Sequence, residues 1–240
     1  MKKLLIVFAL ISPIFIWAQD DEFPSVNPTA LFITVEGEEL DELSGSQSAP
    51  LVAHFYANPA NVGLYTARYE WKIWKEGEED SPLVHRFEQD IDYTFTNSGS
   101  FQIQLYATFV LGNDTIAYPQ EGEENPFHVS ITESKLEFYN ALSPNGDGFN
   151  DTLKPKECQS IVSFEAAIFN RWGSKIYSWN EPNGEWDGKW HGKVVKDGVY
   201  FLVVNATGAE GHKYHIKKAI TVLSGSDTSS SSGGETTPDE

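Results

Sequence analysis

A short loop holds the side chains in this sequence that are best suited to bind a cation. Asn145, Asp147 and Asp151 lie within seven residues of each other, with glycines between them. Their oxygens can converge on a hard cation such as calcium. The same side chains can instead accept hydrogen bonds from the backbone of their own loop, which would make the loop structural. An EF-hand is excluded, because the twelfth position counted from Asn145 is Lys156 and not a carboxylate.

The other reactive residues match no catalytic template. None of the six histidines forms an H-E-x-x-H pair, and the chain has no G-x-S-x-G elbow, phosphate loop or dinucleotide fingerprint. The one cysteine, Cys158, cannot form an intrachain disulfide, and we expect it to be a small buried apolar side chain. We therefore predict a protein without enzymatic activity and with no cofactor, apart from calcium if the loop binds it.

Charge and the first residues bear on partners and location. The formal net charge is −18, which disfavours nucleic acid as a partner. Residues 1–18 have the features of a signal peptide: two lysines, an apolar run and the small residue Ala18. The run is short for a membrane span, so we expect no integral span. The sequence predicts export through the periplasm to the outer membrane, the cell surface or the medium, with residues 19–28 as a flexible leader.

Residues 29–133 show many short runs with strand periodicity and turn residues between them, which is typical of an immunoglobulin-like sandwich. Asp114–Tyr118 should form a hairpin with Phe109–Leu111 across Gly112-Asn113. The predicted strands are Leu31–Val35, Leu51–Tyr56, Tyr69–Lys75, Leu83–Phe87, Tyr93–Phe95, Phe101–Phe109, Asp114–Tyr118 and Phe127–Thr132.

Part of this region is similar to PKD domains. Asp92–Phe101 resembles their Y-x-x-x-G-x-Y strand pair and Tyr69–Trp71 their central strand, although their F-G-D-G loop is absent. The resemblance implies a protein or glycan ligand for this domain. We expect Trp71 and Trp74 to lie in and over the core and not to form a sugar-binding platform.

Residues 134–223 predict a second sandwich, which makes the protein all-β with two immunoglobulin-like β-sandwich domains in tandem. Val199–Val204 is almost wholly apolar and should be buried on both faces. Asn180–Gly192 should form a long loop held by Trp179, Trp186 and Trp190. Residues 224–240 are too polar to form a core, and we expect them to be disordered. The predicted strands are Lys135–Leu142, Val162–Asn170, Lys175–Ser178, Gly198–Thr207 and Lys213–Leu223.

Four ordered segments of the second half resemble the C-terminal sorting domain of the Bacteroidetes type IX secretion system in its type B, gliding-motility-associated form. They contain a S-P-N-G-D-G loop, an F-N-R-W-G turn, a W-D-G-K turn and a D-G-V-Y strand start. The matching residues are Ser143, Pro144, Asn145, Gly146, Asp147, Gly148, Asn150 and Asp151; Asn170, Arg171, Trp172 and Gly173; Trp186, Asp187 and Gly188; and Asp197, Gly198 and Tyr200.

The resemblance implies that this domain is a recognition module read by the type IX translocon and its associated outer-membrane β-barrel proteins. Docking is then expected through strand edges and the motif loops. Three functions stay open at this point. The two leading ones are a small accessory or signalling component of the apparatus and a surface adhesin whose first domain binds protein or glycan. The third is a hydrolase fragment or a regulator of one. The segment after residue 223 departs from the family, whose sorting domain normally ends close to the chain terminus.

Overall fold

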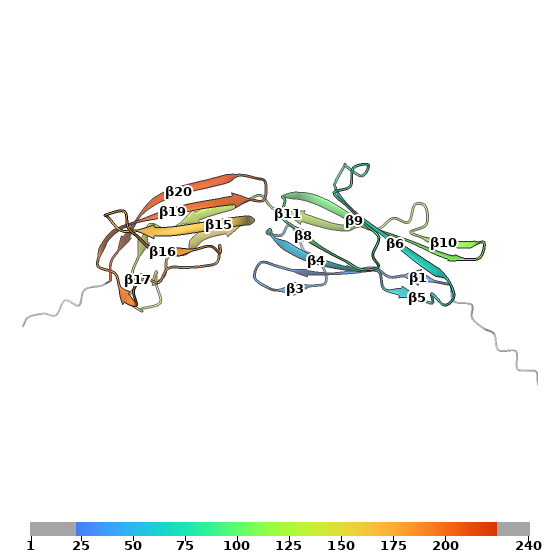
Figure 1. The fold of residues 1–240 in the computed structure, drawn as a ribbon, viewed down its shortest axis with the longest axis horizontal. Helices are drawn as coiled ribbons and strands as arrows, with labels where there is room; N and C mark the ends of the chain where they lie inside the picture. Colours follow the sequence, from blue (N-terminus) through green and yellow to red (C-terminus); the bar gives the residue numbers. More distant parts are fainter. Residues whose placement is uncertain (1–22, 225–240) are drawn as a thin grey trace, which may run out of the picture.

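The computed structural model describes residues 23–224, and within that range the protein is all-β with no helix. The two domains lie end to end along the long axis (Figure 1). The predicted arrangement of two immunoglobulin-like sandwiches in tandem is confirmed. The predicted signal peptide and nearly all of the polar C-terminal segment lie outside the described residues. Within the described range no helix is long and apolar enough to cross a membrane.

The first domain packs two sheets face to face. One has the order β3-β2-β4-β8, and the other has the order β10-β9-β6-β7, with β11 also paired to β9. This division of the strands between two packed sheets is typical of an immunoglobulin fold. The strands are β1 (Ser25–Val26), β2 (Thr29–Ile33), β3 (Glu39–Leu40), β4 (Leu51–Tyr56), β5 (Pro59–Ala60), β6 (Thr66–Lys75), β7 (Val84–Arg86), β8 (Ile91–Phe95), β9 (Gly99–Leu111), β10 (Asp114–Tyr118) and β11 (Phe127–Ile131).

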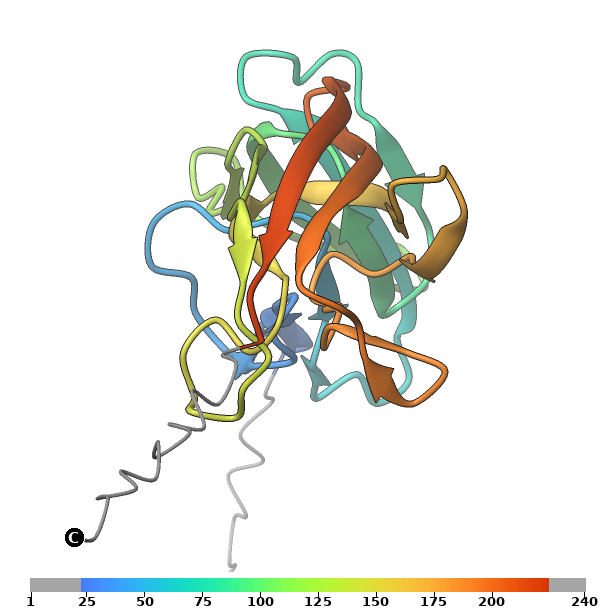
Figure 2. The same cartoon turned by 90° about the vertical axis from the view of Figure 1, so that its left-hand side faces the viewer.

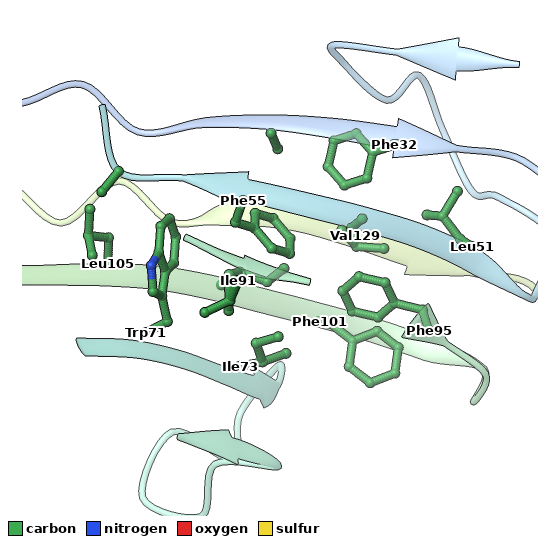
Figure 3. Packing of buried hydrophobic residues seen from close by; sticks show 14 of the residues in the cluster. Phe32, Leu51, Phe55, Trp71, Ile73, Ile91, Phe95, Phe101, Leu105 and Val129 are labelled. Carbon is green, nitrogen blue, oxygen red and sulfur yellow. The ribbon is translucent and has the colours of Figure 1, made fainter. Parts of the chain in front are cut away.

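Aromatic side chains from both sheets fill the core of this domain (Figure 3). Trp71 is completely buried, lies 5.7 Å from Phe55 between ring centroids, and donates its indole N–H to the carbonyl of Gln89. Trp74 is also buried. Both tryptophans are therefore core residues and not a sugar platform, as predicted. The β9–β10 hairpin also has the predicted register, with Asp114 opposite Leu111.

One short strand differs from the expectation for the leader. Ser25 and Val26 lie within the segment predicted to be flexible, yet they form β1 and pair with β5. Val26 is buried in the core of the first domain. The hydrophobic side chain of Val26 fixes this segment, because its burial removes apolar surface from water.

The second domain is built on a five-stranded sheet with the order β13-β20-β19-β15-β16. A small sheet of β12 and β14 and the segment around Trp186 complete its core. The strands are β12 (Lys135–Phe138), β13 (Ala141–Leu142), β14 (Pro155–Gln159), β15 (Ile161–Phe169), β16 (Lys175–Trp179), β17 (Lys189–Trp190), β18 (Lys193–Val194), β19 (Gly198–Gly208) and β20 (Lys213–Val222).

The prediction that Val199–Val204 is buried on both faces is wrong. Leu202 and Val204 are completely buried, whereas Val199 and Phe201 are each 44% exposed. Only one face of β19 packs on the core, so burial alternates with the period of two that strand geometry imposes. The apolar side chains on the other face are therefore available at the surface.

The two domains meet at a hydrogen-bonded junction centred on Ser160. Its side-chain oxygen accepts the backbone N–H of Ala49 at 3.1 Å and lies 2.8 Å from the hydroxyl of Thr132. Its own N–H donates to the hydroxyl of Ser48. Ser160 is 1% exposed, and Ala209 from the second domain joins the core cluster of the first. Hydrogen bonds and apolar packing therefore both hold the two domains together.

The connecting segment between β11 and β12 has three residues, 132–134. The N–H of Thr132 donates to the carbonyl of Gln47 at 2.9 Å. The N–H of Ser134 donates to the carboxylate of Glu210, and its hydroxyl lies 2.9 Å from that of Tyr214. Two of the three connecting residues are thus fixed by contacts with the domains on either side.

Replacing Ser160 by alanine should weaken this junction. The N–H of Ala49 would lose its acceptor inside a buried interface, which costs about 1–3 kcal/mol. We expect thermal unfolding of the full chain to begin at a lower temperature and to separate into two transitions. Ser163→Ala is the matched control, since Ser163 is exposed on the adjacent strand. Identical melting curves for Ser160→Ala and Ser163→Ala would contradict this role.

Candidate docking site

Strand register places all four sorting-like motifs at one end of the second domain. β15 starts beside Ser160 and ends at Phe169, opposite Phe201 near the start of β19. β20 ends at Val222, opposite Gly198. β13 pairs in parallel with this end of β20, so the loop after Leu142 lies there too. This end is the one farthest from the first domain, and Figure 2 views it directly.

The Ser143–Asp151 loop is held by its own side chains. The two oxygens of Asp151 accept the N–H groups of Gly146 and Gly148, each at 2.7 Å. Asp147 accepts the N–H of Phe149 at 2.8 Å and the side-chain amide of Asn145. These four hydrogen bonds use all four carboxylate oxygens of Asp147 and Asp151. They leave Phe149 at the surface, with 77% of its area exposed. The loop therefore has the hydrogen bonding expected of a structural loop, which was one of the two alternatives that the sequence left open.

Calcium binding by Asn145, Asp147 and Asp151 stays a prediction. Among residues 23–224 no group of three or more His, Cys, Asp or Glu side chains is arranged to hold a metal ion. A calcium ion here would have to share carboxylate oxygens that already accept backbone N–H groups. The melting temperature with calcium and then with a chelator measures such binding, because a ligand of the native state raises that temperature.

Asn170 builds the second motif. Its side-chain oxygen accepts the N–H groups of Trp172 and Ser174, each at 3.0 Å, which closes the turn between β15 and β16. Gly173 takes a φ of +79° in this turn, a value that favours glycine. The turn presents Trp172 with 79% of its area exposed. The guanidinium carbon of Arg171 lies 5.4 Å from the centre of that ring, which is a cation–π contact.

Trp186 lies in the opposite environment to Trp172. It is completely buried, and its indole N–H donates to the carbonyl of Lys189 at 3.0 Å. Its backbone exchanges hydrogen bonds with Leu153. The next glycine, Gly188, is so close to Pro144 that a Cβ there would lie 2.9 Å from the proline ring. Trp186 and Gly188 therefore position the third motif and join it to the first.

The fourth motif closes this end of the domain. Asp197 accepts the backbone N–H and the hydroxyl of Ser224, so it holds the chain as it leaves β20. The hydroxyl of Tyr200 donates to the carbonyl of Lys196, and its ring lies 5.7 Å from that of Trp186. Burial raises the pKa of Tyr200, so its phenol stays neutral and able to donate.

A groove lies between the Asn170–Gly173 turn, the β17–β18 hairpin and the start of β19. Its volume is about 480 Å³. Trp172 and Trp190 stand in its lining, and both are substantially exposed. The second, third and fourth motifs therefore form or support one concave, partly apolar surface.

The residues that sequence reasoning missed are those of the β17–β18 hairpin. The sequence predicts that Trp190 holds the Asn180–Gly192 loop against the sandwich, but its side chain is 46% exposed and lines the groove. Val194 is 44% exposed beside it. The glycines around the hairpin were the available signal, since Gly192 has a φ of +75°.

Cys158 also differs from its prediction. It is an exposed free thiol on β14 and not a buried one. Partial burial of the sulfur, followed by the charge of Glu36, raises its pKa, which lowers the thiolate fraction and disfavours nucleophilic chemistry.

Hydrogen bonds lower the pKa of three motif carboxylates. The donors are chiefly the Asn145 amide for Asp147, the Lys189 ammonium for Asp187 and the Ser224 hydroxyl for Asp197. Their contribution to stability is complete above the ordinary carboxyl pKa and is lost as pH falls through the lowered values. We expect melting temperature to fall on acidification from about pH 5 to about pH 3. The fall should be smaller in Asp147→Asn, and an equal fall would contradict this assignment.

The family comparison matches the same region. Residues 136–222 match the family model of the CHU_C Type IX secretion signal domain. The second domain, here called the sorting domain, is similar to that family over this range. The match spans all four motifs. The sorting domain therefore carries its motif residues at the end farthest from the domain junction.

Two solved structures resemble most of the chain weakly. A structure of the fibronectin(III)-like modules of Clostridium thermocellum CbhA shows 13% identity over 72% of this chain and 85% of that chain, with a TM-score of 0.23. The crystal structure of DIP-gamma IG1+IG2 shows 12% identity over 84% of this chain and 97% of that chain, with a TM-score of 0.24. No curated protein sequence matches. The fold assignment rests on the sheet topology.

Proposed function

We propose that this protein is a non-enzymatic component of the type IX pathway that docks on the outer-membrane secretion machinery through its sorting domain. The sorting domain itself implies export and a contact with that machinery. The observation that carries the proposal is the convergence of four separate motifs on one end, which exposes Phe149, Trp172 and Trp190. Large apolar groups gathered at a surface mark an interaction site.

The domain junction supports lasting attachment of the sorting domain. A peptidase that released this domain would have to bind an extended, accessible segment between the two sandwiches. The segment of residues 132–134 is short, and contacts to Gln47, Glu210 and Tyr214 hold two of its three residues, Thr132 and Ser134. The sorting domain then acts as a permanent dock, and the first domain remains with it at the outer membrane.

Deletion of the gene separates this function from its alternative. If the protein is a component of the apparatus, secretion of unrelated type IX cargo should fall in the deletion strain and return when the full chain is restored. Normal cargo secretion together with loss of cell attachment would instead identify an adhesin whose first domain binds protein or glycan. Unchanged secretion and unchanged attachment would contradict both functions.

A further inference from the structure

The groove of the sorting domain has walls of a particular chemistry. Ile176, Val195 and Val199 contribute aliphatic surface, and Trp172 and Trp190 contribute aromatic surface. A volume of about 480 Å³ falls within the range of roughly 300–1,000 Å³ typical of ligand pockets. Aliphatic walls favour an apolar side chain, because its burial removes apolar surface from water.

The charged side chains around the groove are mainly cationic. Arg171, Lys193 and Lys196 line it, and within residues 23–224 none of the three forms an ion pair with a carboxylate. The one carboxylate in the lining, Asp197, already accepts two hydrogen bonds from Ser224. The groove therefore complements a negatively charged partner.

This cationic groove contrasts with the remainder of the chain. Residues 23–133 contain 18 carboxylates and 4 Lys or Arg side chains, for a net charge of −14. Residues 134–224 contain 10 carboxylates and 11 Lys or Arg side chains, for a net charge of +1. The acidic first domain repels an acidic partner, so such a partner would be directed toward the sorting domain.

The β17–β18 hairpin adds a backbone contribution. It is a two-stranded sheet of Lys189–Trp190 and Lys193–Val194, and among the described residues these two strands pair only with each other. Within that range each strand keeps one edge free of ladder partners, and an extended segment can pair with such an edge while its side chains enter a neighbouring pocket.

We propose that the groove binds an extended, acidic polypeptide segment of the docking partner, with one large apolar side chain inserted between Trp172 and Trp190. The proposal rests on the proposed docking function and specifies the partner chemistry. The apolar side chain meets the aliphatic walls, and the acidic flanks meet Arg171, Lys193 and Lys196.

The indole N–H signals of Trp172 and Trp190 in the full chain report directly on this groove. They are assigned with Trp172→Phe and Trp190→Phe, and the protein is titrated with the synthetic peptide Glu-Glu-Phe-Glu-Glu. Both signals should shift. Glu-Glu-Ser-Glu-Glu and Lys-Lys-Phe-Lys-Lys should each bind at least about fivefold more weakly, because each lacks one of the two matching features. The double variant Lys193→Gln, Lys196→Gln should weaken binding of Glu-Glu-Phe-Glu-Glu and reduce the salt dependence of that binding. Lys213→Gln, at the far end of β20, should change neither.

Several results would overturn the proposal. No shift with Glu-Glu-Phe-Glu-Glu, or equal shifts with all three peptides, removes the assigned chemistry. Tighter binding of an oligogalacturonate would make the groove a glycan site, and tighter binding of a peptide of residues 225–240 would make this chain its own occupant. If the wild-type protein binds none of the peptides while a groove variant still loses outer-membrane docking, the docking function stands and only the partner chemistry is refuted.

Discussion

The double variant Trp172→Ala, Trp190→Ala should lose its association with the outer membrane while its melting temperature stays close to that of the wild type. Both side chains are exposed, so their removal changes little in the core. Each stands at the mouth of the groove, where a buried aromatic contact with a partner is worth about 2 kcal/mol or more. We expect co-purification with outer-membrane machinery to fall at least about tenfold.

Two controls make that result specific. Leu64→Ala removes a large side chain that is 86% exposed on the first domain, and it should leave co-purification unchanged. Full co-purification of the double tryptophan variant would contradict a docking role for the groove. A large fall in the melting temperature of the double variant would show that the two tryptophans support the fold, and its co-purification would then not report on docking. In that case the variant Trp172→Phe, Trp190→Phe takes its place in the comparison with the wild type.

Trp186→Ala should have the reverse effect and unfold the sorting domain. The side chain is completely buried, contacts Tyr200 and satisfies the carbonyl of Lys189. Removal of a buried aromatic side chain costs about 3–5 kcal/mol. A domain is stable by only about 5–15 kcal/mol in total. Chemical denaturation followed by circular dichroism should show a much earlier transition for the second domain.

The comparison with Trp172→Ala gives this prediction its control, because the same substitution is made at another motif tryptophan in the same domain. Equal stability losses for Trp186→Ala and Trp172→Ala would contradict the burial of the first and the exposure of the second. A loss confined to Trp186→Ala assigns the third motif to folding and the second to contact with a partner.

The fold could be predicted because it depends on local patterns, and the four motifs were identified by their resemblance to a known family. Alternating apolar residues predict strands, and the Asn-Gly-Asp-Gly loop is recognisable from its composition alone. The roles of individual motif tryptophans could not be predicted. Trp172 and Trp186 both stand beside a turn, and only the packing of Leu153 and Tyr200 around Trp186 distinguishes them.

Tertiary placement also explains two of the wrong predictions in the second domain. The apolar run of β19 suggested burial on both faces, but no layer covers Val199 and Phe201 among the described residues. Trp190 could not be assigned to the groove, because the groove forms only where the β17–β18 hairpin meets the turn at Asn170. Such a surface is difficult to predict from the sequence, because the residues that form it lie apart along the chain.

The most direct test of the central claim is the intact mass and location of the protein in wild-type cells and in cells without a working type IX translocon. We predict that wild-type cells hold the chain at the outer membrane with its sorting domain still attached, and that translocon-deficient cells retain it in the periplasm. Surface protein cut near residues 132–134 would contradict the permanent dock and establish released cargo. Periplasmic protein of the same mass in both strains would contradict docking altogether.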